Sequence, residues 1–125
     1  MLFPLLLALQ ITAGAVPADS GWTLSGDAKI ERYRGTESLR INAGRAVRPG
    51  IQLQDGTIEF DVEVIPFRSF VYLQFRIEAD GEMEEIYFRP HKTGLPDAVQ
   101  YNPVWRGDSF WQLWHGPGSD AAPRF

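Results

Sequence analysis

Three carboxylates at every second position could support acid–base chemistry. They are Glu59, Asp61 and Glu63. On a β-strand such residues share one face, with neighbours about 7 Å apart. Retaining glycoside hydrolysis needs two carboxyl groups about 5–5.5 Å apart, one as nucleophile and one as acid/base. Alternating acids are also ordinary on the solvent face of an antiparallel strand. We favour that simpler interpretation, so the sequence predicts no catalytic residue and leaves these three as the only candidates.

A second set of residues mixes flat aromatic rings with planar hydrogen-bonding groups. Its members are Tyr72, Gln74, Arg76, Glu85, Tyr87 and Arg89. Sugars present apolar C–H faces and a polar rim, so a sugar site needs aromatic rings beside amide, carboxylate and guanidinium groups. A solvated ladder of salt bridges with one Arg–Tyr stack would have the same composition and is the commoner arrangement on half-exposed sheets. The set is our predicted ligand-binding face, and the ladder stays open as its alternative.

A third set is a dense group of aromatic residues near the C-terminus. It contains Tyr101, Trp105, Trp111 and Trp114. Rings this close together could form a stacking platform for a ligand. Packing between two sheets is the commoner explanation for any one of them.

The polar-aromatic set requires a hairpin to bring its two halves together. Residues 69–78 and 83–89 alternate in polarity and flank Asp80-Gly81. Asp-Gly is typical of a two-residue type I′ turn, because both central residues need positive φ. This turn would place Phe75 opposite Ile86 and Arg76 opposite Glu85, with one apolar face for the core and one polar face for solvent.

The strand that carries the three acids should lie beside this hairpin. Residues 56–64 alternate cleanly, and matching apolar faces sets Phe60 against Phe75. The same register would place Glu59 opposite Arg76, which favours the pairing modestly. We therefore expect a three-stranded meander in the middle of the chain.

The remaining mature chain reads as further short strands separated by Gly and Pro turns. We expect strands at 98–102, interrupted by Pro103, and at 109–115, with no strand after His115. No ten-residue window there shows helical periodicity. Many short strands with regular turn signals predict an all-β fold, an antiparallel β-sandwich of the jelly-roll kind.

The N-terminal 18 residues differ in composition from the rest of the chain. None of these 18 residues has a charged side chain. Residues 2–9 form an apolar run, which is followed by small residues at 13–15 and 16–18. This pattern predicts a signal peptide over 1–18 and a secreted or periplasmic domain over 19–125. A buried N-terminal helix is the alternative. The run is too short for a stable membrane span, so we expect no membrane insertion after cleavage.

Charge and composition restrict the partners and cofactors. The net charge is −4 and there is no cysteine. An acidic chain without a basic run argues against nucleic-acid binding. Asp97 and Asp108 lie in loops where calcium would be conceivable, but calcium needs six to eight oxygen ligands and the sequence does not supply that set. We expect no cofactor and no metal, and we interpret Arg106-Gly107-Asp108 as a turn.

Several segments in order resemble a known superfamily. The segments are Asp55–Val62, Phe75-Arg76, Tyr87–Pro90 and Asp97–Pro103. Together they resemble the concanavalin A-like lectin/glucanase superfamily, especially secreted bacterial domains of the laminin-G-like or glycoside hydrolase family 16-like kind. The resemblance implies two antiparallel sheets and carbohydrate held on the concave one. Such domains are longer, so the resemblance also implies that the C-terminal strands are missing and the sandwich is incomplete.

The sequence thus leaves three functions open. The first is an exported carbohydrate-binding or glycan-associated domain without catalysis. The second is the N-terminal part of a glycoside hydrolase that acts on polysaccharide. The third is a structural or adhesion module with no small ligand.

Overall fold

The computed structural model describes the backbone of residues 6–11, 14–15, 21–65 and 67–125, and the side chains from residue 21 onward. The chain divides into two compact units, residues 1–65 and 66–125, called unit 1 and unit 2 below. Each unit contains one antiparallel sheet. The all-β, antiparallel prediction is therefore confirmed. The sandwich, the jelly roll and the division into residues 1–18 and 19–125 stay predictions.

Unit 1 is built around one long hairpin. Its strands are β3 (Thr23–Tyr33) and β4 (Thr36–Val47). Arg34 and Gly35 connect them with φ values of 48° and 84°. Positive φ at both positions of a two-residue loop defines a type I′ turn. Leu39 of β4 is 1 % exposed and is the most buried large apolar side chain of the described residues.

The strand that carries the three acids lies in unit 1. β5 (Ile58–Glu63) pairs with β1 (Leu6–Ile11), from Leu6↔Glu63 to Ile11↔Ile58. β1 also pairs with β4 and with the short β2 (Gly14–Ala15). The predicted pairing of Phe60 with Phe75 would join the two units and stays a prediction. The apolar run at 6–11, predicted as part of a leader, supplies one partner strand of β5.

That pairing does not bear on whether the N-terminal segment is cleaved. The signal peptide and the export of the protein stay predictions, and residues 13 and 16–18 of the two cleavage patterns lie outside the described residues. Among the described residues, no helix is long and apolar enough to span a membrane.

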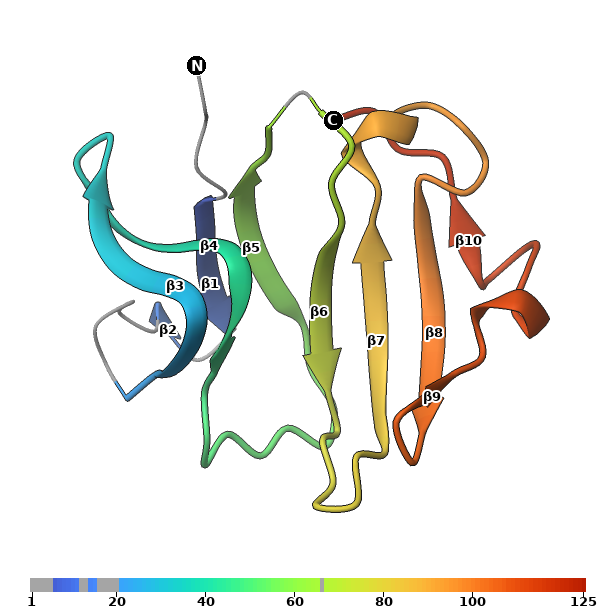
Figure 1. Ribbon diagram of the computed structural model, residues 1–125, viewed down its shortest axis with the longest axis horizontal. Helices are drawn as coiled ribbons and strands as arrows, with labels where there is room; N and C mark the ends of the chain where they lie inside the picture. The colour runs from blue at the N-terminus through green and yellow to red at the C-terminus, as the bar shows by residue number, and fades with distance from the viewer. Residues whose placement is uncertain (1–5, 12–13, 16–20, 66) are drawn as a thin grey trace. The chain divides into compact units, whose positions relative to one another are not determined.

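Unit 2 contains the predicted hairpin. Across its sheet, β6 (Val71–Phe75), β7 (Met83–Phe88) and β8 (Val99–Trp105) lie side by side in that order (Figure 1). Two short strands, β9 (Asp108–Ser109) and β10 (Asp120–Ala121), pair with the outer edge of β8. The 3₁₀ turns η1 (Pro90–Lys92) and η2 (Trp111–Leu113) complete the unit.

The turn between β6 and β7 differs from the predicted one. Gly81 has a φ of 85°, but Asp80 has no positive φ, so the turn is not type I′. Gly81 N–H donates to Glu78 O, and Glu78 N–H donates to Glu82 O. This is a type I turn over 78–81 followed by a left-handed glycine, the usual three-residue hairpin loop.

A second irregularity lies just before this turn, at Arg76, whose φ is 50°. It adds one residue to the β6 arm of the hairpin, so Phe75 lies opposite Glu84 and Leu73 lies opposite Ile86. The predicted register, with Phe75 opposite Ile86, is wrong by two residues. Because the side-chain period of a strand is two, this error leaves each residue up to Phe75 on its predicted face.

The C-terminal part also departs from expectation. Residues 109–115 were predicted to form a strand, but β9 ends at Ser109 and η2 follows. β10 lies beyond His115, where no strand was expected. Three large apolar side chains of this segment are exposed: Trp111 by 41 %, Leu113 by 76 % and Trp114 by 44 %.

Candidate functional site

Three rows of side chains cross one face of the unit 2 sheet. Strand pairing aligns Tyr72, Tyr87 and Gln100 in one row and Gln74, Glu85 and Asn102 in the next. The third row runs through Met83, Val104 and Ser109. Of the six residues predicted for this face, the rows bring together Tyr72, Gln74, Glu85 and Tyr87. We call this surface the polar face.

The polar face is more buried than predicted. Glu85 is 5 %, Tyr87 5 %, Gln100 1 % and Asn102 1 % exposed. On the opposite face, Leu73, Phe75, Ile86 and Phe88 are only half-buried. The expectation of a solvated polar face is therefore wrong for this sheet. The reason is that the segment of η2 folds onto the polar side chains.

Gln100 makes that contact. Its Nε2 donates to the backbone oxygens of Trp111 and Trp114, over 2.7 Å and 2.8 Å. Its Oε1 accepts from the Tyr87 hydroxyl at 2.6 Å and from Arg89 Nη2 at 3.1 Å. One buried amide thus satisfies two carbonyls and two donors, which makes burial of this polar row tolerable.

Arg89 follows the end of β7, contacts the first row through Gln100 and is 8 % exposed. Its Nη2 lies 3.1 Å from Asp97 Oδ2, and its guanidinium lies 4.9 Å from the centre of the Tyr87 ring. Lys92 Nζ also contacts Asp97 Oδ2, at 2.5 Å. The hydrogen bond from Lys92, with the charges of Arg89 and Lys92, lowers the pKa of Asp97 despite some desolvation. Arg89 is therefore a paired, structural part of the face.

Glu85 is held by neutral groups alone. Gln74 Nε2 donates to Glu85 Oε2 over 2.8 Å, and Asn102 Nδ2 donates to Glu85 Oε1 over 2.5 Å. Asn102 Nδ2 also donates to Ser109 Oγ over 2.7 Å. The Asn102 oxygen accepts from Phe110 N–H over 3.0 Å. Asn102 therefore links the carboxylate to the chain that follows β9.

An open hollow of about 350 Å³ is lined by residues from all three rows. It is lined by Tyr72, Gln74, Met83, Glu85, Val104, Gly107 and Ser109. An apolar side made by Met83 and Val104 thus adjoins an amide, a hydroxyl and a carboxylate. Tyr72, at 51 % exposure, presents its ring beside these groups.

The surroundings of Tyr72 combine aromatic rings and negative charge. Its ring stacks on Phe70 with centroids 6.4 Å apart, and lies 5.8 Å from the ring of Tyr87. Burial, followed by the charge of Glu85, raises the pKa of the Tyr72 hydroxyl, and Arg89 opposes this shift. The hydroxyl therefore stays protonated as a hydrogen-bond donor over the ordinary pH range.

Arg76 does not belong to the polar face. Its Nη1 lies 2.8 Å from Glu84 Oε1 in an exposed ion pair, instead of opposite Glu85. The left-handed φ of Arg76 and the shifted register cause this change. The predicted Arg76–Glu85 pair is wrong.

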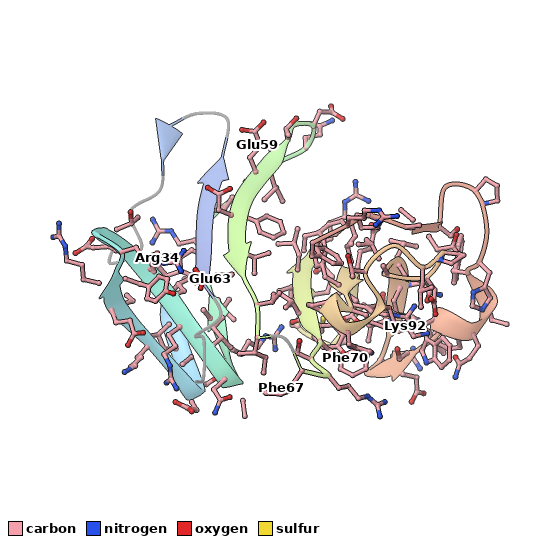
Figure 2. All side chains as sticks on the ribbon, turned by 90° about the horizontal axis from the view of Figure 1, so that it is seen from above. Arg34, Glu59, Glu63, Phe67, Phe70 and Lys92 are labelled. Atoms are coloured by element: carbon pink, nitrogen blue, oxygen red, sulfur yellow. The ribbon has the colours of Figure 1, made fainter. Side chains whose placement is uncertain are left out.

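The three acids of β5 are in different surroundings. Glu59 and Asp61 are exposed. Glu63 accepts from the Tyr33 hydroxyl at 2.7 Å and lies 3.3 Å from Arg34 Nη1. Figure 2 shows Glu63 beside Arg34, with Glu59 toward the other end of β5. Arg76, the predicted partner of Glu59, forms an ion pair with Glu84 in its own unit. The predicted Glu59–Arg76 contact would join the two units and stays a prediction.

The C-terminal aromatic residues form three separate pairs. Tyr101 and Trp114 meet edge to face at 5.6 Å, and Trp111 meets His115 in the same way at 6.4 Å. The Trp105 ring lies under the Arg106 guanidinium, 4.6 Å away. These contacts do not make one continuous platform.

The described residues contain no group of three or more side chains suited to hold a metal ion. Asp97 is engaged by Lys92 and Arg89. His91 Nδ1 lies 3.1 Å from the Ser69 carbonyl oxygen at the surface. Arg106 and Gly107, with φ values of 52° and 86°, form a two-residue turn between β8 and β9, as predicted for this tripeptide.

Sequence reasoning missed the contribution of β8 and β9 to the face. Gln100 and Asn102 alternate with Val99 and Tyr101, and this alternation was visible in a segment already predicted as a strand. Their partners were hidden because no turn signal fixed the register between β7 and β8. The role of Ser109 depended on the unpredicted end of β9.

In comparisons with known proteins, no family model, no curated protein and no solved structure matches this chain.

Proposed function

We propose that this protein is an exported, non-catalytic carbohydrate-binding protein whose sugar site is the hollow on the polar face. The observation that carries the proposal is the composition of that hollow. An exposed Tyr72 ring stands next to the planar groups of Gln74 and Glu85 and the hydroxyl of Ser109. A sugar ring needs this combination, a flat apolar surface for its C–H groups and oriented polar groups for its hydroxyls.

Preorganisation supports the same proposal. Glu85, Gln74 and Asn102 are fixed to one another by hydrogen bonds on three adjacent strands. A ligand would meet groups that are already oriented, so little side-chain freedom is lost on binding. Sites built on strands also hold their geometry more accurately than sites built on loops.

A binding role fits the carboxylates better than hydrolysis. Glu85 is the one carboxylate among the described residues that line the hollow. Retaining and inverting hydrolysis both use a pair of carboxyl groups flanking the scissile bond. Glu63 is engaged by Tyr33 and Arg34.

The test is oligosaccharide binding by calorimetry, with gluco-, xylo- and amino-sugar oligomers as probes. Tyr72→Ala should weaken binding by about tenfold or more, because an aromatic stacking contact is worth roughly 1.5 kcal/mol. Trp105→Ala is the matched control, since Trp105 is also 51 % exposed but does not line the hollow. Equal affinity of Tyr72→Ala and the parent chain for every oligomer, or no binding at all, would contradict the proposal.

A further inference from the structure

The charges of unit 2 leave one buried carboxylate without a cation. Arg76 pairs with Glu84, and both Arg89 and Lys92 pair with Asp97. Arg68 lies over the Phe70 ring and Arg106 over the Trp105 ring. No positively charged side chain of the described residues lies within ion-pair distance of Glu85, which is 5 % exposed.

A buried charge without a counter-charge is costly, and amide hydrogen bonds offset only part of that cost. An ionised carboxylate has about four acceptor positions. Gln74 and Asn102 each fill one of them at Glu85. Glu85 therefore has acceptor capacity left, and it lines the hollow where a ligand would enter.

The ring of Tyr72 favours the same kind of ligand. Tyr72 lines the hollow together with Glu85, and its ring is half exposed. An aromatic face attracts a cation electrostatically. The whole chain adds a net charge of −4, so long-range forces also draw a cation toward the protein.

We propose that the hollow selects a sugar that carries a free, protonated amine, and that Glu85 forms an ion pair with that ammonium group. The inference rests on the proposed carbohydrate function and specifies its ligand class. The ammonium would occupy the position that a cationic side chain would fill in an ordinary buried ion pair. The apolar face of the same sugar would lie against Tyr72.

The experiment compares three trisaccharides of the same linkage: glucosamine trimer, its N-acetylated form and cellotriose. The three share ring shape and differ in the group at carbon 2, which is an ammonium, an acetamide or a hydroxyl. The glucosamine trimer should bind at least about tenfold more tightly than the other two, because hydrogen bonds to charged groups exceed those to neutral ones. 1,4-Diaminobutane, an amine without a sugar ring, should bind more weakly than the glucosamine trimer.

The outcomes separate the two proposals. Equal binding of all three trisaccharides would overturn the amine preference and leave the carbohydrate function standing. Binding of none of them, with binding of 1,4-diaminobutane, would overturn both in favour of a simple amine site. Tighter binding of cellotriose or of the acetylated trimer would also overturn the amine preference.

The variant Glu85→Gln then tests whether Glu85 causes the preference for the amino sugar. The variant should reduce the advantage of the glucosamine trimer over cellotriose to about onefold, even if both trisaccharides bind more weakly than to the parent. Glu84→Gln is the matched control, since Glu84 is the adjacent acid, ion-paired with Arg76 on the opposite face. An amine preference that survives in Glu85→Gln would refute the role of Glu85, and this comparison of two ligands on one variant does not depend on its stability.

Discussion

Glu63 in unit 1 and Glu85 in unit 2 are both strand carboxylates with two hydrogen-bonding neighbours, and they differ in charge balance. Glu63 has the Arg34 guanidinium at 3.3 Å and the Tyr33 hydroxyl at 2.7 Å. Glu85 has two neutral amides, those of Gln74 and Asn102. The Glu63 carboxylate therefore has a counter-charge within the fold. The Glu85 carboxylate has none among the described residues and is available to pair with a cationic ligand in the hollow.

The comparison teaches that spacing in the sequence is a poor guide to which acid is available. Glu63 belongs to a regular series of three acids, yet its charge is already paired. Glu85 has no such pattern around it, and its availability comes from the irregular φ of Arg76, which turns that arginine toward Glu84.

The largest effect should come from removing the residue that supports Glu85. Asn102→Ala leaves Glu85 Oε1, Ser109 Oγ and Phe110 N–H without their partner. Leaving buried polar groups unsatisfied costs about 1–3 kcal/mol each, and relaxation recovers part, so we expect a loss of about 3 kcal/mol in unfolding free energy. Urea denaturation followed by tryptophan fluorescence measures it.

Asn42→Ala is the control for that loss. Asn42 is exposed and donates to Asp27 over 2.9 Å, so its removal should change the unfolding free energy by less than about 0.5 kcal/mol. Similar losses in both variants would show that the Glu85 network does not hold unit 2 together.

A smaller effect should appear at the tyrosine beside Glu63. The hydrogen bond to Glu63 is the main reason that the pKa of Tyr33 is raised above its ordinary value of 10.0. Glu63→Gln should therefore lower the Tyr33 pKa, as followed by NMR of the ring carbons. A raised folded-state pKa stabilises the fold below pH 10.0, and this contribution is lost as the pH rises through the folded-state value. An unchanged Tyr33 pKa would contradict the contact.

The smallest effect should appear at the tyrosine beside Glu85. Burial contributes most to the raised pKa of Tyr72, and the Glu85 charge comes second. Glu85→Gln should lower the Tyr72 pKa by less than Glu63→Gln lowers that of Tyr33. Each variant should leave the other tyrosine unaffected, and the same NMR titration checks both. A larger shift at Tyr72 would mean that the charge of Glu85 exceeds burial in importance.

The sequence predicted strand character well because alternation is a local property. β6, β7 and β5 follow from alternating residues, and their faces are correct even though the β6–β7 register is wrong by two. The turn at Arg106-Gly107 also follows from local composition. Asp80-Gly81 shows the limit of such signals, because its glycine is left-handed but the turn is not the predicted type I′.

Partner strands and burial could not be predicted in the same way, because both depend on residues distant in sequence. Nothing in residues 58–63 indicates that 6–11 is a partner strand. Likewise, Glu85 and Tyr87 read as solvent-facing until Gln100 binds the carbonyls of Trp111 and Trp114. The site was half predicted: its β6 and β7 residues were, and those from β8 and β9 were not.

Pro103 has a consequence for how unit 2 behaves among other proteins. It lies on β8 between the segments that pair with β10 and with β9, and its carbonyl accepts from Phe110 N–H. The nitrogen of a strand residue points to the same side as its carbonyl, so here the outer edge meets a nitrogen without hydrogen. β9 and β10 are two residues long each, and the proline separates them. An extended chain from a second molecule would therefore find no uninterrupted row of donors along this edge, which protects the sheet from growing by strand addition.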